Sequence, residues 1–427
     1  MKIIVIILAA AMILAGCADQ SSSTENKDNG SKADITDDNS SNAQQDVSDP
    51  LNSKFYNVSE DIVDKDSKVI ATIQRYGAAI LTDHGLFYTA LPEGVDDSQK
   101  LYEYHLFDTE SKTDKVLATV ENRTYEPGYV RTELGDCVYT LVLCGELLDD
   151  EPDKQVLYKF DLVKGTAEAV HSVEGRIMPY TALTSFGDKI VFCDIVMENE
   201  IWEYRVMEYD PATGNCTQKI VHTLGSDLHG AAIRQLCSEG DKLYALRLQY
   251  DGETVVNMFL DCYDKSYNKL SEKDLTTTVA AAALLEVPQE DVYNETCQPV
   301  NRLYVKDGKY VYYENFSITR FLADLETGEL IFETNGMFAA SNGSGEPFFF
   351  WQLGGDGTGE TQGLNGIFTL KDGKVEKSLF EADDPKYQIM SASVSRNGSR
   401  TIEVTYTSPS DRNDTLPTKM YLFPANT

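Results

Sequence analysis

A sequence motif that recurs about every fifty residues constrains the fold of this chain more than any other feature. A Gly-Asp turn leads into a strand of alternating apolar residues, as at 134–139, 186–192 and 239–244. A second strand, of the form apolar-Tyr-x-apolar-Asp, then ends at another turn. Short strands repeated at a fixed period of about 40 to 50 residues are typical of β-propeller blades. Copies of the second strand begin at Leu101, Leu157, Tyr204, Phe259, Phe321, Ile367 and Met420.

The repeat predicts an all-β fold, a β-propeller of seven four-stranded blades. Six or eight blades remain open if a degenerate copy lies near Cys297 or Met337. Residues 68–73 resemble residues 115–120 and 219–224, which we expect to form the outer strands of their blades. Residues 68–73, however, precede the first blade, and the last copy of the repeat has no outer strand. We therefore expect the N-terminal strand to complete the final blade, which closes the ring and leaves no open edge.

Small residues recur at the start of most repeats, where strands of a propeller converge on its axis. Five segments share this property: 77–79, 181–182, 230–232, 339–341 and 391–393.

One segment departs from the repeat pattern. Residues 276–286 are rich in Ala and Leu and stop before Pro288, which predicts a short inserted helix, packed on the rim or capping one face.

The N-terminus has the features of an export signal. Lys2 precedes thirteen apolar residues, too few to cross a bilayer but typical of a signal peptide. Leu14-Ala15-Gly16-Cys17 resembles the lipobox of bacterial lipoproteins, which implies a signal peptide of residues 1–16 and lipidation of Cys17. The alternative is an ordinary secretory signal with an incidental Cys17.

Residues 17–53 combine Ser and acidic residues without any aromatic, which predicts a disordered tether. The propeller domain would then cover 54–427, on the extracellular face of the bacterial cytoplasmic membrane.

Residues 393–402 loosely resemble the repeat of TolB-like propeller proteins, with Asn397 in the place of the usual Asp and no Pro. The whole chain looks like the propeller lipoproteins of Gram-positive gut bacteria. That resemblance implies a sensor, scaffold or binding role.

The net charge of −32 argues against nucleic acid and anionic lipid as partners, because both require clustered cations. We therefore expect the protein to contact the membrane through the lipid only. The protein itself is expected to be a monomer. Besides Cys17 the chain has seven Cys, with no C-x-x-C pair, so they are buried thiols or include disulfides.

A ligand site is expected at one face of the propeller, where the loops that enter the inner strands meet those joining second and third strands. Rings there could stack on a sugar or peptide while Arg binds a carboxylate or phosphate. Alternatively, the Tyr residues pack between blades and the Arg residues neutralise nearby acids. The candidate binding residues are Tyr76, Arg75, Tyr125, Arg123, Tyr180, Arg176, His229, Phe338 and Tyr387.

The joining loops are acidic, as at Glu93, Asp96, Asp251 and Asp356, so Ca²⁺ is possible there, although no EF-hand spacing occurs and no cofactor is expected. The aromatic run 348–351 predicts a buried strand or a carbohydrate platform.

No catalytic motif is present: the chain has neither G-x-S-x-G nor H-E-x-x-H, and its five His residues share no metal spacing. The expected function is that of a non-catalytic module that binds a glycan, a peptide or a protein. The alternatives are a glycan-active enzyme, a glycosidase or lyase working with paired carboxylates, and a structural component of an envelope complex.

Overall fold

The computed structural model describes most of the chain after residue 56, and all of the described residues belong to one unit, Lys54–Thr427. They are residues 57–77, 79–122, 130–144, 153–175, 182–252, 254–276, 300–306, 310–315, 320–334, 337–339, 348–350, 367–371, 374–377, 387–395, 397–406 and 418–425. The predicted signal peptide, the tether and, beyond Thr276, the predicted helix lie outside them. Among the described residues, no helix is long and apolar enough to cross a membrane.

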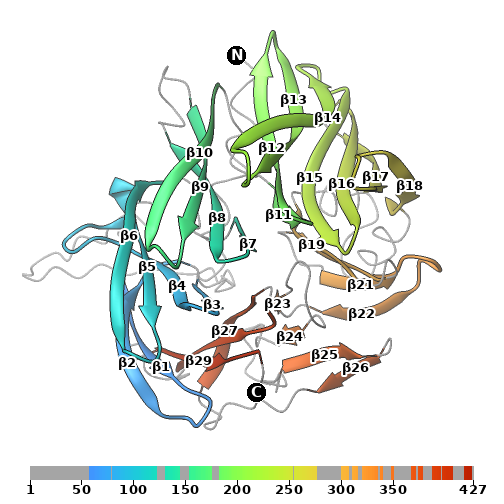
Figure 1. Ribbon diagram of the computed structural model, residues 1–427. Helices are drawn as coiled ribbons and strands as arrows, with labels where there is room; N and C mark the ends of the chain where they lie inside the picture. The colour runs from blue at the N-terminus through green and yellow to red at the C-terminus, as the bar shows by residue number, and fades with distance from the viewer. Residues whose placement is uncertain are drawn as a thin grey trace, which may run out of the picture. The chain divides into compact units, whose positions relative to one another are not determined.

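The first two blades are four-stranded antiparallel sheets in chain order (Figure 1). Each begins with a short strand and ends with a longer outer one, and the short 3-10 helix η2 (Asp97–Gln99) precedes β5. Their strands are β3 (Ala79–Thr82), β4 (Gly85–Ala90), β5 (Leu101–Asp108) and β6 (Thr113–Glu121), then β7 (Arg131–Leu134), β8 (Cys137–Cys144), β9 (Asp153–Asp161) and β10 (Thr166–Gly175).

The next eight strands form one sheet that divides into two groups of four. Only the pair Leu224↔Gly230 joins β14 to β15. Gly230 has φ +140°, and a Cβ there would lie 2.2 Å from the Thr223 carbonyl oxygen, so this junction requires glycine. The strands are β11 (Leu183–Phe186), β12 (Lys189–Glu198), β13 (Ile201–Asp210) and β14 (Asn215–Gly225), then β15 (Gly230–Glu239), β16 (Lys242–Asp251), β17 (Thr254–Tyr263) and β18 (Lys269–Asp274).

Two further four-stranded antiparallel sheets follow. The aromatic run at 348–350 forms a strand between two others, in agreement with its interpretation as a strand. The strands are β19 (Val300–Lys306), β20 (Tyr310–Asn315), β21 (Arg320–Asp324) and β22 (Leu330–Thr334), then β23 (Met337–Ala339), β24 (Phe348–Phe350), β25 (Ile367–Lys371) and β26 (Lys374–Lys377).

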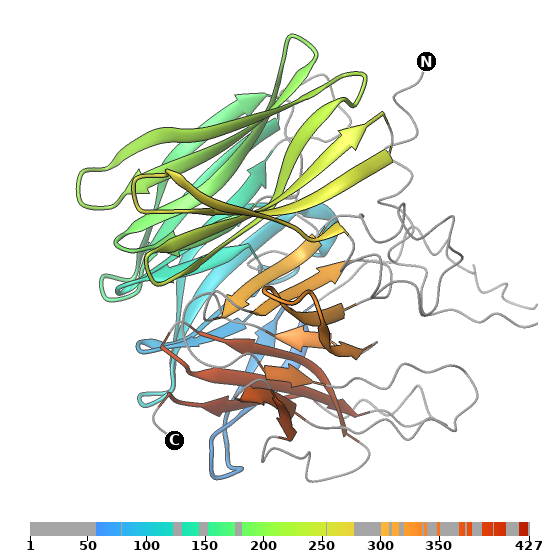
Figure 2. The same cartoon turned by 90° about the vertical axis from the view of Figure 1, so that its right-hand side faces the viewer.

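The last sheet combines both ends of the domain, as the sequence predicted. Its five strands run in the order β2-β1-β29-β28-β27, and the N-terminal and C-terminal strands lie side by side in both views (Figures 1 and 2). β1 pairs in parallel with β29, from Glu60↔Thr418 to Val63↔Tyr421. The strands are β27 (Tyr387–Val394), β28 (Arg400–Tyr406), β29 (Thr418–Phe423), β1 (Val58–Val63) and β2 (Val69–Arg75).

One detail of this prediction was wrong. The expected closing strand, 68–73, falls largely in β2, the fifth strand, whereas β1 takes the place beside β29. Burial explains the order: Ile62 and Val63 of β1 are 0% and 2% exposed, while most of β2 is partly or fully exposed. The more deeply buried strand therefore occupies the inner position.

The first strands of successive blades lie against one another. β7 contacts β11, β11 contacts β15, β15 contacts β19, and β27 contacts both β23 and β3. Hydrogen bonds link them, from Ser393 Oγ to the Ala79 carbonyl (2.9 Å) and from the Ser185 amide to Thr132 Oγ1 (3.1 Å). Ala79 and Ser393 belong to two of the small-residue segments that the sequence places at the axis, whereas Thr132 and Ser185 lie outside those segments.

The chain is a β-propeller. The described strands fall into seven groups of four or five, but segments outside the described residues separate several of them. The total of seven blades therefore stays a prediction.

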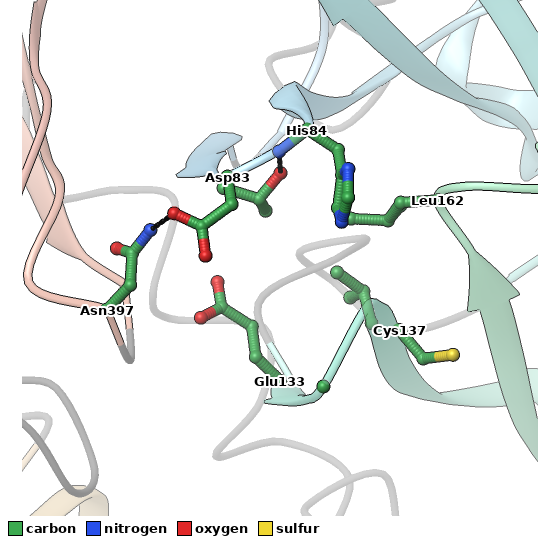
Figure 3. Close-up of a pocket in the computed structure, with 9 residues that line it drawn as sticks. Asp83, His84, Glu133, Cys137, Leu162 and Asn397 are labelled. Carbon is green, nitrogen blue, oxygen red and sulfur yellow. Dashed lines mark hydrogen bonds between the residues drawn. The ribbon is translucent and has the colours of Figure 1, made fainter.

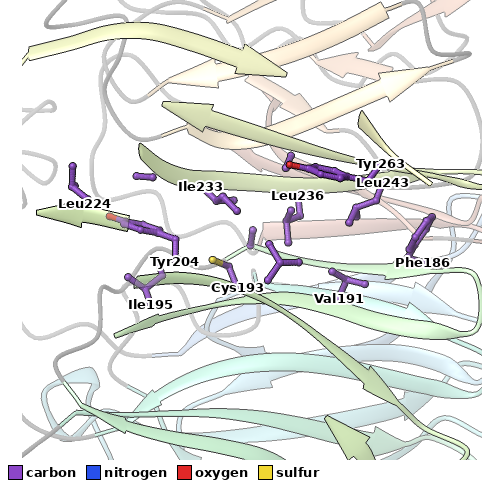
Figure 4. Packing of buried hydrophobic residues seen from close by; sticks show 14 residues of the cluster. Phe186, Val191, Cys193, Ile195, Tyr204, Leu224, Ile233, Leu236, Leu243 and Tyr263 are labelled. Atoms are coloured by element: carbon purple, nitrogen blue, oxygen red, sulfur yellow. The ribbon is translucent and has the colours of Figure 1, made fainter. Parts of the chain in front are cut away.

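The hydrophobic core lies between neighbouring blades. In the cluster of Figure 4, Val191 and Ile195 of β12 and Tyr204 of β13 pack with Ile233 and Leu236 of β15. Every one of these side chains is at most 1% exposed. Blade-to-blade burial of this kind lets a long chain fold without a single large core.

The described cysteines are free thiols, so disulfides play no part in this region of the chain. Cys193, Cys237 and Cys262 are buried within strands, where a thiol behaves as a small hydrophobic group. Cys137, Cys144 and Cys216 are partly exposed.

Candidate functional site

The two loop sets expected to form a binding face lie together in the first and fourth blades, where residues of both sets are described. The Tyr76 amide, before β3, donates to the Thr89 carbonyl near the end of β4 (2.8 Å). In the fourth blade, His229 Nε2 lies 2.8 Å from Asp251 Oδ1, which ends β16. The loops that enter the inner strands thus meet the loops between second and third strands, as the sequence predicted.

Arg75 lies at the base of this face and is bound by carboxylates of the protein itself. Its Nε lies 2.5 Å from Glu60 Oε2 and its Nη2 lies 2.6 Å from Glu403 Oε1, while Nη1 donates to the Gly77 carbonyl. The residue is only 8% exposed. This arrangement matches the alternative interpretation, in which arginine neutralises nearby acids.

Two carboxylates share this single guanidinium, which affects the protonation of Glu60. Burial of the carboxyl is the main cause that raises the pKa of Glu60 to about 7, and the negative charge of Glu403 adds to it against the opposing effect of Arg75. The cluster joins β1, β2 and β28, and so it joins the two ends of the domain.

The other candidate residues of this face are only partly described. The Tyr76 ring stacks on Tyr102 with centroids 5.7 Å apart, on the core between the first two blades. Phe338 lies in β23 and Tyr387 begins β27. Arg123, Tyr125, Arg176 and Tyr180 lie outside the described residues. The binding role of this set therefore stays a prediction.

A cavity of about 200 Å³ lies at the other end of the first strands, where β3, β7 and β27 finish (Figure 3). It opens among the turns β3–β4, β7–β8 and β27–β28, which belong to the first, second and last blades. It is lined by Thr82, Asp83, His84, Glu133, Gly135, Cys137, Val138, Leu162 and Asn397. Sequence reasoning placed no site on this face.

Asp83 is held in position by the last blade. Asn397 Nδ2 donates to Asp83 Oδ1 over 2.5 Å, while Asn397 Oδ1 accepts the Ser399 amide hydrogen over 2.8 Å. With both ends of its amide bound, Asn397 has little freedom to turn. The exposed Asp83 carboxylate is thereby fixed at the mouth of the cavity.

His84 connects the first blade to the second. Its Nε2 lies 2.7 Å from Asp136 Oδ1, on the Gly135-Asp136 turn. The turn that carries His84 ends at Gly85, where φ is +124° and a Cβ would lie 2.3 Å from the Phe107 carbonyl oxygen. Only glycine is accommodated there, so the backbone fixes where His84 projects.

Glu133 of β7 completes the polar lining. In Figure 3 the carboxylates of Asp83 and Glu133 point toward each other across the cavity. The wall beside them is apolar, because Val138 and Leu162 are buried. No Lys or Arg is among the described residues that line this cavity, and Arg396 of the β27–β28 turn lies outside the described residues. The described lining thus combines two carboxylates with an apolar wall.

A second polar cluster lies between the second and third blades. His171 Nε2 lies 3.1 Å from Asp194 Oδ2, and Asp194 is 2% exposed. The hydrogen bond to Asp194, with a smaller contribution from Cys216, raises the pKa of His171 to about 10. His222, at the matching place one blade later, has a lowered pKa because of burial and the nearby Arg247.

Metal binding finds no support in the part of the chain that the structure describes, where no three His, Cys, Asp or Glu side chains are grouped to hold an ion. Of the acidic loop residues, Asp251 pairs with His229, and Asp96 accepts the Ser98 amide hydrogen at the start of η2.

No protein-family model matches the sequence, and no curated protein matches it. Several solved structures with low sequence identity to this chain have a similar fold. U3-55K has a TM-score of 0.43 and 9% identity, over 84% of this chain and 98% of that chain. The β-propeller domain of the Trilobed protease from Pyrococcus furiosus has a TM-score of 0.36 and 11% identity, over 83% and 80% of the two chains.

A protein from Lactobacillus plantarum has a TM-score of 0.39 and 14% identity, over 72% of this chain and 91% of that chain. Similarity at this level concerns the arrangement of strands and carries no inference about a ligand or an activity.

Proposed function

We propose that this chain is a lipid-anchored β-propeller of the bacterial cell surface that acts as a non-catalytic ligand-binding module. The ligand would be a glycan, a peptide or a protein. Residues 1–17 support the anchoring, since an apolar run ends at a lipobox-like sequence before Cys17. The fold supports a binding role only in general terms, because propellers host many functions.

The cavity at the ends of β3, β7 and β27 is the observation that carries the binding proposal. Its polar side chains come from three blades and are positioned by other side chains: Asn397 holds Asp83, and Asp136 holds His84. Polar groups fixed in this way around an apolar wall suit recognition, because little mobility is lost when a ligand binds.

The test is array binding by the full-length protein, extracted in detergent and offered to glycan and peptide arrays. Asn397→Ala releases Asp83 in the cavity, whereas Tyr76→Ala alters the aromatic face predicted from the sequence. Binding that is lost in Asn397→Ala and kept in Tyr76→Ala supports the cavity. The reverse result assigns the ligand to the other face, and arrays with no signal contradict a glycan or peptide ligand.

A glycan-active enzyme is the second candidate, favoured by the facing carboxylates of Asp83 and Glu133. Glycosidases use such a pair, one as acid and the other as base or nucleophile. Release of nitrophenol from a panel of aryl glycosides, abolished by Glu133→Gln, would support it. Absence of release across the panel would leave the binding module as the function.

Anchoring has its own test. The wild-type protein is expected in the membrane fraction, and Cys17→Ala should move it out of that fraction. A variant that stays on the membrane to the same extent as wild type would contradict lipidation of Cys17.

A further inference from the structure

We infer that Asn397 is a deamidation site which the hydrogen bonds of the closed ring hold back, and that its conversion to an acid weakens the contact between the last and first blades. The inference goes beyond the proposed function, because it concerns the covalent stability of the ring closure and does not depend on any ligand. It derives from the residue that follows Asn397 and from the partners of its side-chain amide.

The sequence around Asn397 favours the reaction. Deamidation begins when the backbone nitrogen of the next residue bonds to the side-chain carbonyl carbon of the asparagine. The side-chain nitrogen leaves as ammonia and takes the proton of that backbone nitrogen, and one water molecule then opens the cyclic imide to aspartate or isoaspartate. The next residue here is Gly398, which has no side chain to hinder the attack. Asn397 and Gly398 are both partly exposed, so water reaches the site.

The β27–β28 turn engages both reacting groups in hydrogen bonds. The Gly398 amide donates to the Ser395 carbonyl oxygen over 3.0 Å, so its nitrogen is already committed to the backbone. The Asn397 side chain accepts hydrogen bonds from the Ser399 amide over 2.8 Å and from the Ser395 hydroxyl. Attack requires the Gly398 nitrogen to lose its proton and the Asn397 side chain to turn toward it, and each of these hydrogen bonds opposes that change.

The first blade adds the hydrogen bond that depends on ring closure. Asn397 Nδ2 donates to Asp83 Oδ1 over 2.5 Å, and Figure 3 shows this bond between a turn of the last blade and a turn of the first. The nitrogen that leaves as ammonia is therefore bound by a residue 314 positions earlier in the chain. Separation of the two blades breaks this bond and gives the amide more freedom to react. The rate of deamidation at Asn397 thus reports on closure of the ring at this turn.

Deamidation also changes the contact between the blades. The product has a carboxylate in place of the amide, so the N–H donor to Asp83 is lost and two carboxylates face each other. Isoaspartate additionally places one more carbon atom in the backbone of a turn that is closed by the hydrogen bond from the Ser395 amide to the Ser399 carbonyl, 2.8 Å long. Both changes weaken the link between the last and first blades at this turn.

The experiment follows deamidation by peptide mass spectrometry in the full-length protein, extracted in detergent. Asn29-Gly30 is the internal reference, because it lies in the segment that the sequence predicts to be disordered. We expect Asn397 to react roughly tenfold more slowly than Asn29 in the folded protein, and at a similar rate in concentrated urea. A Glu-specific protease isolates Asn397 in the peptide 382–403, in which it is the only asparagine.

Two aspartate variants connect the protection to ring closure. Asp83→Ala removes the acceptor on the first blade and should raise the rate at Asn397 by roughly threefold or more, while the rate at Asn29 stays unchanged. Asp241→Ala is the matched control, since Asp241 lies on the corresponding turn of the fourth blade, 79% exposed and paired with Lys265. It should leave the rate at Asn397 unchanged.

Asn397→Asp reproduces one product of the reaction and tests its effect on the fold. Its melting temperature should fall by about 1–3 °C, whereas Asn29→Asp should melt as wild type does. Three outcomes overturn the inference: equal rates at Asn397 and Asn29 in the folded protein, an unchanged rate at Asn397 in Asp83→Ala, or equal melting temperatures of Asn397→Asp and wild type. The first and third comparisons do not use Asp83→Ala, so they remain decisive if that variant fails to fold.

Discussion

The guanidinium of Arg75 lies 2.6 Å from the carboxylate of Glu403, and so a residue near the start of the propeller is paired with one near its end. Arg75 ends β2 and Glu403 lies in β28, on either side of the two strands β1 and β29. Glu60 of β1 shares the same guanidinium at 2.5 Å. All three residues are at most 9% exposed, so this ion cluster is a buried part of the ring closure.

Arg75→Met should destabilise the fold strongly. The change leaves Glu60 and Glu403 buried without a cation, and removing one partner of a buried pair costs about 3–5 kcal/mol. Urea unfolding at pH 8 measures the loss. Lys65→Met, which breaks the exposed Lys65–Asp66 pair, should change the free energy of unfolding by less than about 1 kcal/mol. Equal effects of the two substitutions would contradict a structural role for the cluster.

Glu60 should make the fold less stable as the pH rises. Its pKa is about 7 in the folded protein and 4.5 as the ordinary value, so the folded state binds the proton more tightly. Its contribution to stability is therefore fully present below pH 4.5 and is lost as the pH rises through about 7. Glu60→Gln should remove this part of the slope, so the variant gains stability relative to wild type between pH 5 and pH 8. A constant difference across that range would refute the assignment.

His171 should titrate far above an ordinary histidine. Its folded pKa of about 10 exceeds the usual 6.5, so the ion pair stabilises the fold fully below pH 6.5 and is lost as the pH approaches 10. NMR titration of the imidazole Cε1–H signals measures it, with His222 as the internal comparison because its pKa is lowered. Asp194→Asn should lower the pKa of His171. A His171 signal that titrates near 6.5 in the wild type would be inconsistent with this pair.

A comparison of Gly230→Ala with Gly214→Ala should distinguish a steric clash from the ordinary cost of replacing a glycine in a turn. A Cβ at Gly230 would lie 2.2 Å from a backbone oxygen, whereas Gly214, with φ +73°, has no atom within 4 Å of the added Cβ. We expect a loss of roughly 1–3 kcal/mol at Gly230 and a smaller loss for Gly214→Ala. Thermal unfolding of the two variants provides the comparison, and a Gly230→Ala variant no less stable than Gly214→Ala would argue against the tight junction of β14 and β15.

The repeat in the sequence predicted much of the fold, because turn residues and apolar alternation act locally. Strands such as β5, β13 and β29 begin close to the residues where the sequence repeat places its second strand. The placement of β1 was missed, because the polar Val58–Val63 segment has no outer-strand pattern. The buried Glu60 in this strand is paired with Arg75, which lies fifteen residues further along the chain.

The cavity was missed for a related reason. Its contacts join residues far apart in the sequence: Asn397 and Asp83 are separated by 314 positions, and His84 and Asp136 by 52. A local pattern carries no information about such pairs, which exist only once the ring has closed. The aromatic residues of the opposite face could be predicted as candidate binding residues because their recurrence is visible in the sequence.

Ring closure is therefore the central claim, since it brings Asn397 of the last blade to Asp83 of the first. The most direct measurement is a disulfide between β1 and β29, using Asp61→Cys with Lys419→Cys, which are Cα partners in the parallel pair. Asp61→Cys with Lys115→Cys is the matched control, because Lys115 lies in β6 beside Gly165 of the second blade. Peptide mass spectrometry after mild oxidation should find the 61–419 link and no 61–115 link. A 61–115 link, or no 61–419 link in folded protein, would contradict closure by the N-terminal strand.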